Sequence, residues 1–258
     1  VGNPTQVPSG VKIETAVDWV SPKDGRLALR RTYRSDGALA HRYFYRGVYA
    51  HQGVWMSDFD ETLFYASGGY PAWTWNYHRR DGVVVPFHPP VTMPNGEKVG
   101  AAIYHGNPMR FTDNNGLRLR EPSGRTVVFR GSYDIWQLTL SEILWPDGYN
   151  IKLTRVPGDG TRVNTITDNR GQRLQYVWTN TPVAGVTSWV ISRVNIDTNF
   201  NGTTFAPDYA IDYTYRANPF EAQLVLIDEV SFHDYQTATS TLQAKYDYDL
   251  TRRVSGVP

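Results

Sequence analysis

Hydrophobic and polar residues alternate along much of the chain, and no stretch keeps the 3.6-residue repeat of an amphipathic helix. Alternation with a period of two predicts β-strands that have one covered face. Residues 10–20 are the first such stretch. Their predicted covered face carries Val11, Ile13, Thr15 and Val17, opposite Lys12, Glu14 and Asp18.

The nearest approach to a helical repeat is residues 132–144. Gly131 before it and Pro146 after it leave room for at most a short helix. A second alternating stretch, residues 26–33, again predicts a strand. It places Leu27, Leu29 and Arg31 on one face, and Ala28, Arg30 and Thr32 on the other.

Turn signals recur between these β-rich runs. Asp-Gly and Asn-Gly pairs supply the positive φ angles that tight hairpin turns require. Their repetition predicts an all-β fold built from a long series of antiparallel hairpins that form a curved sheet. The pairs are Asp24-Gly25, Asp36-Gly37, Asp81-Gly82, Asn95-Gly96, Asn115-Gly116, Asp147-Gly148 and Asn201-Gly202.

The second half of the chain carries a loose internal repeat. Residues 143–153 read as strand, turn and strand, and residues 166–178 read as a similar unit. Tyr-x-Tyr endings follow at 213–215 and 246–248. Repeats of about 20 to 45 residues are typical of stacked units that bury their faces against one another.

These patterns predict a single domain over residues 1–258, because no low-complexity linker interrupts them. Within it, residues 1–65 are expected to form entry strands and residues 111–258 the repeats. Residues 66–110 are rich in Trp, Pro and Gly, and are expected to be an irregular excursion from the sheet.

The amino-acid composition limits which partners and which chemistry the protein can have. Lys and Arg total 26 against 25 for Asp and Glu, so the net charge of +1 gives no field to attract nucleic acid. The chain has no cysteine, hence no disulfide or thiol chemistry. No apolar run approaches the roughly 18 residues that span a bilayer. The start at Val1-Gly2-Asn3-Pro4 indicates a processed or excised piece of something longer.

Motifs for a serine nucleophile, a phosphate-binding loop and a histidine zinc site are missing from the sequence. No G-x-S-x-G occurs, and Ser9 and Ser123 sit in Pro-Ser-Gly turns. No phosphate-binding loop occurs either, so no cofactor is expected. No two histidines have the H-E-x-x-H spacing of a zinc site, and a structural role is expected for all of them. They are His41, His51, His78, His88, His105 and His233.

One cluster of acidic residues is compatible with a carbohydrate-binding or carbohydrate-cleaving site. Asp58, Asp60 and Glu61 offer the paired carboxylates of a glycosidase, and Trp73 and Trp75 could stack on sugar rings. Aromatic side chains more often pack β-sheets, so a packing role is favoured.

A calcium-loop spacing occurs once. Asp197, Asn199, Asn201 and Asp208 fit the positions of oxygen ligands around Ca²⁺. Two of the early ligands are neutral amides, and position twelve is Asp preceded by Pro207. An Asx-rich hairpin loop is therefore favoured over calcium binding.

Clusters of basic residues are only isolated pairs, too short for a nucleic-acid surface. Solvated positions at strand edges are expected, where charge discourages aggregation between sheets. The pairs are Arg30-Arg31, Arg79-Arg80 and Arg252-Arg253.

Taken in order, several segments resemble the RHS/YD-repeat family of bacterial surface and toxin-delivery proteins. Each segment is degenerate alone, and their order carries the resemblance. They are the opening at 3–19, the L-x-L-x-R-x-Y-x-S strand at 27–35, Gly53-Val54-Trp55, the Pro-Asp-Gly turn at 146–148, the D-x-x-G-x-x-L-x-Y unit at 168–176 and the tail at 246–257.

The resemblance implies a β-sheet that spirals into a shell around a C-terminal toxin or effector. It also implies a secreted or surface-exposed bacterial protein whose partner is the remainder of a larger chain or the toxin cargo. At 258 residues the chain is too short for a whole shell, and the family's aspartyl self-cleavage motif is not present.

The sequence thus predicts a structural role without catalysis. Two alternatives stay open: a secreted carbohydrate-binding or glycan-cleaving β-protein, and a surface adhesive module that dimerises through an open sheet edge.

Overall fold

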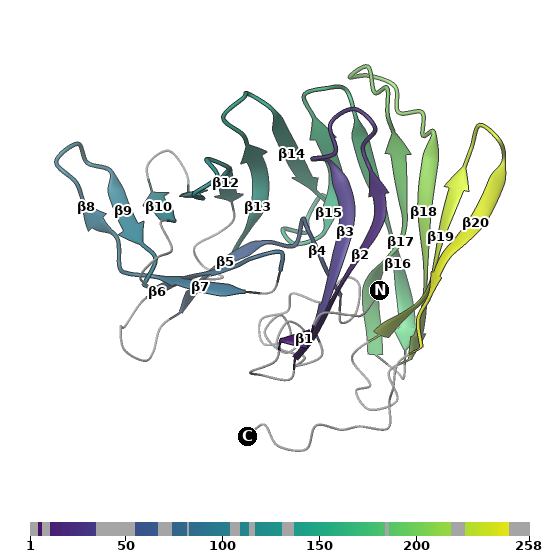
Figure 1. Ribbon diagram of the computed structural model, residues 1–258, viewed down its shortest axis with the longest axis horizontal. Coiled ribbons are helices and arrows are strands. Elements are labelled where there is room, and N and C mark those ends of the chain that lie inside the picture. Colours follow the sequence, from purple (N-terminus) through teal and green to yellow (C-terminus); the bar gives the residue numbers. More distant parts are fainter. Residues whose placement is uncertain are drawn as a thin grey trace.

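The computed structural model describes residues 5–6, 11–34, 55–66, 74–81, 83–103, 109–113, 117–130, 137–183, 186–217 and 225–247. Within these ranges every regular element is a β-strand, as the sequence predicts (Figure 1). None of the described residues forms a helix of membrane-spanning length and hydrophobicity.

The first four strands form a small antiparallel sheet of their own. Its order is β1-β2-β3-β4, and it shares no backbone ladder with the rest of the described chain. Side chains alone must therefore hold its face against the large sheet. Its strands are β1 (Thr5–Gln6), β2 (Val11–Val20), β3 (Ala28–Arg34) and β4 (Trp55–Ser57).

Strands β13 to β20 form one run of the large sheet in which each strand pairs with the next along the chain. All of these pairings are antiparallel, so neighbours in sequence are neighbours in space. The strands are β13 (Gln137–Leu144), β14 (Asn150–Arg155), β15 (Val163–Asp168), β16 (Arg173–Val183), β17 (Val186–Asp197), β18 (Tyr209–Ala217), β19 (Val225–Asp234) and β20 (Thr239–Lys245).

Strands also run through residues 66–110, where the sequence predicts an irregular excursion. Of the described prolines there, Pro86 lies within β7, and Pro89, Pro90 and Pro94 lie between strands. These short strands continue the large sheet beyond β13. Those that lie within or touch residues 66–110 are β5 (Thr62–Ala66), β6 (Thr74–His78), β7 (Val84–Phe87), β8 (Val91–Thr92), β9 (Lys98–Ala101) and β10 (Arg110–Asp113). They are followed by β11 (Leu117–Arg120) and β12 (Thr126–Arg130).

The large sheet forks at β13. One edge of β13 pairs with β12, while the other is shared between β5, at residues 137–139, and β14, at residues 142–144. The β5–β7 branch then returns to β9, because Phe87 bridges Ala102 and the amide of Ile103 donates to Pro86 O at 2.9 Å. The sheet folds back at this end and stays open at β20 (Figure 1).

The predicted turns are confirmed wherever the structure describes both residues. Gly25, Gly96, Gly148 and Gly202 have φ angles between 77° and 92°. At least one residue of each of the other three Asx-Gly pairs lies outside the described ranges.

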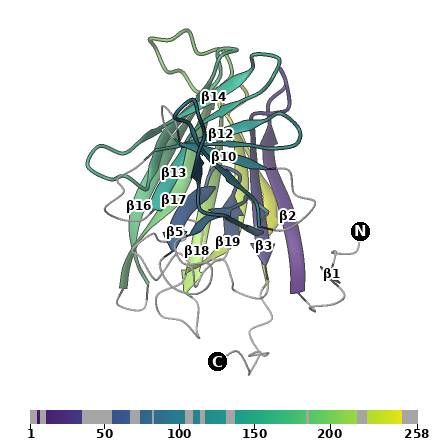
Figure 2. The same cartoon turned by 90° about the vertical axis from the view of Figure 1, so that its left-hand side faces the viewer.

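A large hydrophobic core joins the two sheets. It contains Trp19 and Leu29 of the small sheet together with Tyr176 and Val194 of the large one. The small sheet lies against the inner, concave face of the large sheet (Figures 1 and 2). The β-structure therefore has two layers where the small sheet covers the large one.

Three predictions for the strand face at residues 10–20 are wrong. Thr15 and Val17, expected inside, are exposed, Val17 by 54%, whereas Asp18, expected outside, is 6% exposed. A register shift between Val17 and Trp19 makes Asp18 the extra residue of a bulge, so Asp18 and Trp19 are both buried although they are consecutive. The segment considered for a short helix is strand β13 over its described part, Gln137–Leu144.

Candidate functional site

A buried ion pair lies between the two sheets. Arg31 donates from Nε to Asp18 Oδ2 at 2.6 Å and from Nη2 to Oδ1 at 2.8 Å. The large sheet adds Tyr213, whose hydroxyl donates to Asp18 Oδ2 at 2.8 Å. Arg31 Nη2 also donates to the Tyr246 hydroxyl at 3.0 Å, and its guanidinium carbon lies 4.7 Å from the Trp55 ring centre.

Protonation in this network is fixed near neutral pH. Burial, reinforced by the charge of Asp18, raises the pKa of Tyr213 well above its ordinary value. Tyr213 therefore keeps its proton and serves as a donor. Because Arg31 is always charged, its ion pair with Asp18 and the Tyr213 hydrogen bond link the two sheets.

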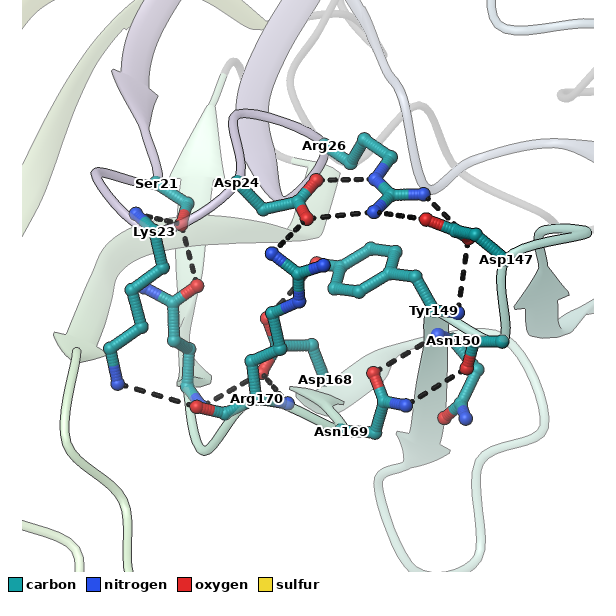
Figure 3. Close-up of polar contacts among 12 residues, drawn as sticks. Ser21, Lys23, Asp24, Arg26, Asp147, Tyr149, Asn150, Asp168, Asn169 and Arg170 are labelled. Carbon is teal, nitrogen blue, oxygen red and sulfur yellow. Dashed lines mark hydrogen bonds and ion pairs between the residues drawn. The ribbon is translucent and has the colours of Figure 1, made fainter.

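Three turns meet at one end of the two sheets, and we call them the turn clamp (Figure 3). They are residues 21–27 between β2 and β3, residues 145–149 between β13 and β14, and residues 168–172 between β15 and β16. Ser21 Oγ donates to Gln172 Oε1 at 2.6 Å, across 151 positions of sequence.

Asp24 is the centre of the turn clamp. It accepts a hydrogen bond from Arg26 Nη2 at 2.7 Å within its own turn and forms an ion pair with Arg170 of the β15–β16 turn. Arg26 reaches the third turn, where Nη1 donates to Asp147 Oδ1 at 2.9 Å. The Arg26 guanidinium also stacks 4.1 Å from the ring of Tyr149.

The two repeat turns are joined directly as well. Asn169 Nδ2 donates to the carbonyl of Gly148 at 2.9 Å, and the Tyr149 hydroxyl donates to Asp168 Oδ2 at 2.9 Å. The small sheet thus docks on a preformed, internally bonded surface of two neighbouring hairpins.

The acidic cluster singled out by sequence is divided among different partners. Asp58 lies 3.3 Å from Arg30 Nη1 and 3.8 Å from Arg80 Nη1. Asp60 Oδ2 instead accepts the amide hydrogen of Ser57 at 2.8 Å, which caps the β4–β5 turn. These two carboxylates therefore serve an ion pair and a turn.

Glu61 is buried in a separate pair. Its Oε2 lies 3.0 Å from Arg125 Nη2, and Arg125 Nη1 donates to Glu121 Oε1 at 2.8 Å. Burial raises the pKa of Glu61, and the Arg125 charge opposes that shift. The arrangement ties β5 to the β11–β12 turn.

The predicted sugar platform is not formed by Trp75. Its side chain is 6% exposed and belongs to the core, so neither ring face is open to a ligand. Trp73 lies outside the described residues.

The described histidines have aromatic or solvent surroundings. The ring of buried His78 lies 4.8 Å from that of Phe64, and the ring of His233 lies 4.6 Å from that of Tyr235. His88 is exposed. Over the described ranges no three His, Asp or Glu side chains gather to hold a metal ion. The other histidines, His41, His51 and His105, lie outside those ranges.

The calcium-like loop uses its carboxylates for its own backbone. Asp197, 3% exposed, accepts the amide hydrogens of Asn199 and Ala206, both at 2.9 Å. Asp208 Oδ2 accepts the amide hydrogen of Thr198 at 2.9 Å. This is the hydrogen bonding of an Asx-rich hairpin loop, the interpretation that the sequence favours.

Two more polar residues from the sequence cap turns. Asn201 Oδ1 accepts the amide hydrogen of Thr203 at 3.0 Å, and Ser123 Oγ accepts that of Arg125 at 3.3 Å. Ser9 lies outside the described residues.

Sequence reasoning missed the Arg31 network. It assigned Arg31 to a solvated basic pair, yet the residue is 1% exposed. A signal was present, because Arg31 shares its alternating face with Leu27 and Leu29, which are both buried. A charge on a covered face implies a buried partner.

Solved structures place this architecture among known proteins. The fold matches the N-terminal domain of effector protein SpvB from Salmonella typhimurium strain LT2, with a TM-score of 0.56 and 9% identity. That match covers 86% of this chain and 99% of the other. The two chains share a fold. No protein-family model and no curated protein sequence matches the chain.

Toxin-complex structures share the fold as well. The Photorhabdus luminescens Tc holotoxin pore matches with a TM-score of 0.55 at 10% identity, over 94% of this chain. A TcdB2-TccC3 crystal structure matches with a TM-score of 0.56 at 10% identity, over 93%. This chain spans 15% and 16% of those two chains, a small part of their length.

Proposed function

We propose that the chain is a structural wall segment of a secreted bacterial protein of the RHS type. In this role it scaffolds or partly encloses a toxin or effector polypeptide and catalyses no reaction itself. The partner would be the remainder of a larger chain or the cargo.

One observation carries the proposal: nearly the whole chain adopts the fold of chains from Tc toxin complexes and of an effector's N-terminal domain. A thin β-sheet wall of this kind needs only a small hydrophobic core, because pairing between strands satisfies the hydrogen bonds of the backbone N–H and C=O groups. A fold alone does not fix a function, so the site chemistry must agree.

The described acidic residues fit this role. Asp18, Asp24 and Glu61 are each occupied by an arginine of the chain, and Asp60 and Asp197 cap turns. A catalytic carboxylate would instead face a space where a substrate can bind.

A protection assay tests the proposal. An extended, protease-sensitive reporter segment fused after Pro258 should be cleaved several-fold more slowly than the same segment fused to an unrelated β-domain of equal length. The rate should rise when Tyr213→Ala weakens the packing of the small sheet. Cleavage at the control rate would contradict a scaffolding role, as would hydrolysis of glycans by the purified chain.

The free edge of β20 favours a second candidate, a surface adhesive module. Residues 239–245 are mostly exposed, contain no proline and pair only with β19 among the described strands. Edges of this kind can pair with another chain. Light scattering at rising concentration should then show dimers that Thr241→Pro abolishes; a monomer at every concentration would rule this candidate out.

A further inference from the structure

An arginine and a tryptophan stack on the inner face of the large sheet. Trp189 is opposite Asn180 in the β16–β17 ladder, and Ile191 is opposite Trp178. Because side chains alternate, Trp189 and Ile191 share a face, and Ile191 belongs to the core. Trp189 nevertheless remains 39% exposed.

Arg162 covers part of the Trp189 ring. Its guanidinium carbon lies 4.1 Å from the centre of that ring and 6.0 Å from that of Trp178. The side chain is 15% exposed and is held by Asp159, whose Oδ2 accepts from Nε at 2.6 Å. Asp159 Oδ1 also accepts the backbone amide of Arg162 at 3.1 Å. The guanidinium is therefore fixed in place before any partner arrives.

The two terminal nitrogens of the Arg162 guanidinium, Nη1 and Nη2, remain available to donate hydrogen bonds to a ligand. Within the part of the chain that the structure describes, neither Nη1 nor Nη2 of Arg162 donates a hydrogen bond, and neither is a buried unpartnered atom. Arg26, Arg31 and Arg125, by contrast, use Nη atoms on carboxylates of the chain itself.

We propose that Arg162 and Trp189 form a subsite on the inner face for an acidic side chain of an extended polypeptide. The carboxylate would accept from both Nη atoms, and an adjacent apolar side chain would pack on the exposed part of the indole. This rests on the proposed wall function and names the chemistry of the segment that the wall holds.

General energetics favour this pairing. Arginine presents a planar fork that matches a carboxylate bidentately. Tryptophan and arginine are the side chains that contribute most often to the energetic centres of protein interfaces. Because Asp159 already immobilises Arg162, little side-chain entropy remains to be lost on binding.

Fluorine NMR of the full chain labelled with 5-fluorotryptophan tests the subsite. The Trp189 resonance is assigned by its loss in Trp189→Phe. Titration with a decapeptide of Gly and Ser around a central Glu-Leu-Glu should shift this resonance saturably. The matched Gln-Leu-Gln peptide should bind about tenfold more weakly, the change expected for about 1.4 kcal/mol.

Substitutions at Arg162 separate the subsite from general charge effects. Arg162→Gln should remove the preference for the acidic peptide, and Arg162→Lys, which keeps the charge without the fork, should retain part of it. Arg193→Gln is the matched control, because Arg193 is 41% exposed and pairs with Asp212. Its preference should equal that of the wild type.

Three results would overturn the subsite: equal shifts with both peptides, an unchanged preference in Arg162→Gln, or a response to an oligosaccharide of uronic acids and none to the peptides. The wall function fails separately, through the protection assay. Loss of reporter protection with an intact Trp189 response would remove that function and leave the peptide subsite standing.

Discussion

The hydroxyl of Tyr213 on β18 donates to Asp18 on β2 at 2.8 Å, although 195 positions of sequence separate them. Asp18 Oδ2 accepts Arg31 Nε as well, so this one oxygen joins the small sheet to the large one. The contact is buried and lies where the two layers of the wall meet. The stability of the two-layer arrangement should therefore depend on it.

Loss of the Arg31 charge should destabilise the chain strongly. Arg31→Met leaves Asp18 buried without its cation, which typically costs about 3–5 kcal/mol. The double variant Asp18→Asn with Arg31→Met should be less unstable than Arg31→Met, since no unpaired charge remains. Urea unfolding followed by tryptophan fluorescence measures both. Arg193→Met at the exposed Arg193–Asp212 pair is the control and should cost less than about 1 kcal/mol.

Asp24→Asn should weaken the turn clamp in a pH-dependent way. The Asp24 side chain is 6% exposed, and hydrogen bonds to charged groups contribute about 1.5–3 kcal/mol each. The hydrogen bond from Arg26 lowers the pKa of Asp24 below its ordinary 3.8. The stability it contributes is therefore present above that value and is lost as the pH falls through the lowered pKa.

Unfolding free energies of the wild type and of Asp24→Asn should thus differ most above pH 5 and converge in strong acid. Asp147→Asn is the control within the clamp. Asp147 is 54% exposed, so its loss should matter less at every pH. A difference that stays constant between pH 7 and pH 2 would show that the Asp24 charge contributes nothing.

Gly124→Ala should cost more than Gly148→Ala. Both glycines have left-handed backbones, with φ of +82° and +84°, where a side chain costs about 1–2 kcal/mol. Only at Gly124 would the added Cβ meet a neighbour, Pro146 Cγ at 2.7 Å. Pro146→Ala in the Gly124→Ala background should recover the excess in thermal unfolding. Equal losses at the two glycines would contradict the packing of the β11–β12 turn on the β13–β14 turn.

Calcium should leave the melting temperature unchanged within about 1 °C, because only ligands that bind the native state raise it. Asp197 and Asp208 already accept backbone amide hydrogens of their own loop. Differential scanning fluorimetry in millimolar Ca²⁺ and in excess chelator compares the two states. A rise that Asp208→Asn abolishes would identify a calcium site instead.

Local patterns in the sequence predicted the all-β class, the hairpin order and the turns. Asx-Gly pairs fix turns over a few residues, and short connections make sequence neighbours pair. The strands between residues 66 and 110 were missed, because their runs are short and Pro86 lies inside one of them. Such short strands form only when neighbouring strands pair with them. The fork at β13 depends on pairing with β5, which is distant in sequence, so local patterns do not predict it.

The polar contacts between the sheets could not be predicted from the sequence either, because they join residues that are far apart along the chain. Ser21 and Gln172, or Asp18 and Tyr213, meet only after the whole sheet has curved. The bulge at Asp18 also buries two consecutive residues, Asp18 and Trp19, which simple alternation does not predict. Alternation with a period of two does not predict where a strand contains one extra residue.

A double-mutant cycle between Asp18 and Tyr213 tests the layered wall most directly. The unfolding free energies of Asp18→Asn, Tyr213→Phe and the double variant give the coupling between the two positions. The layered arrangement predicts a coupling of about 1 kcal/mol or more, since the hydrogen bond is buried and involves a charge. Additive losses, with no coupling, would mean that the entry strands do not rest on the inner face of the repeat sheet.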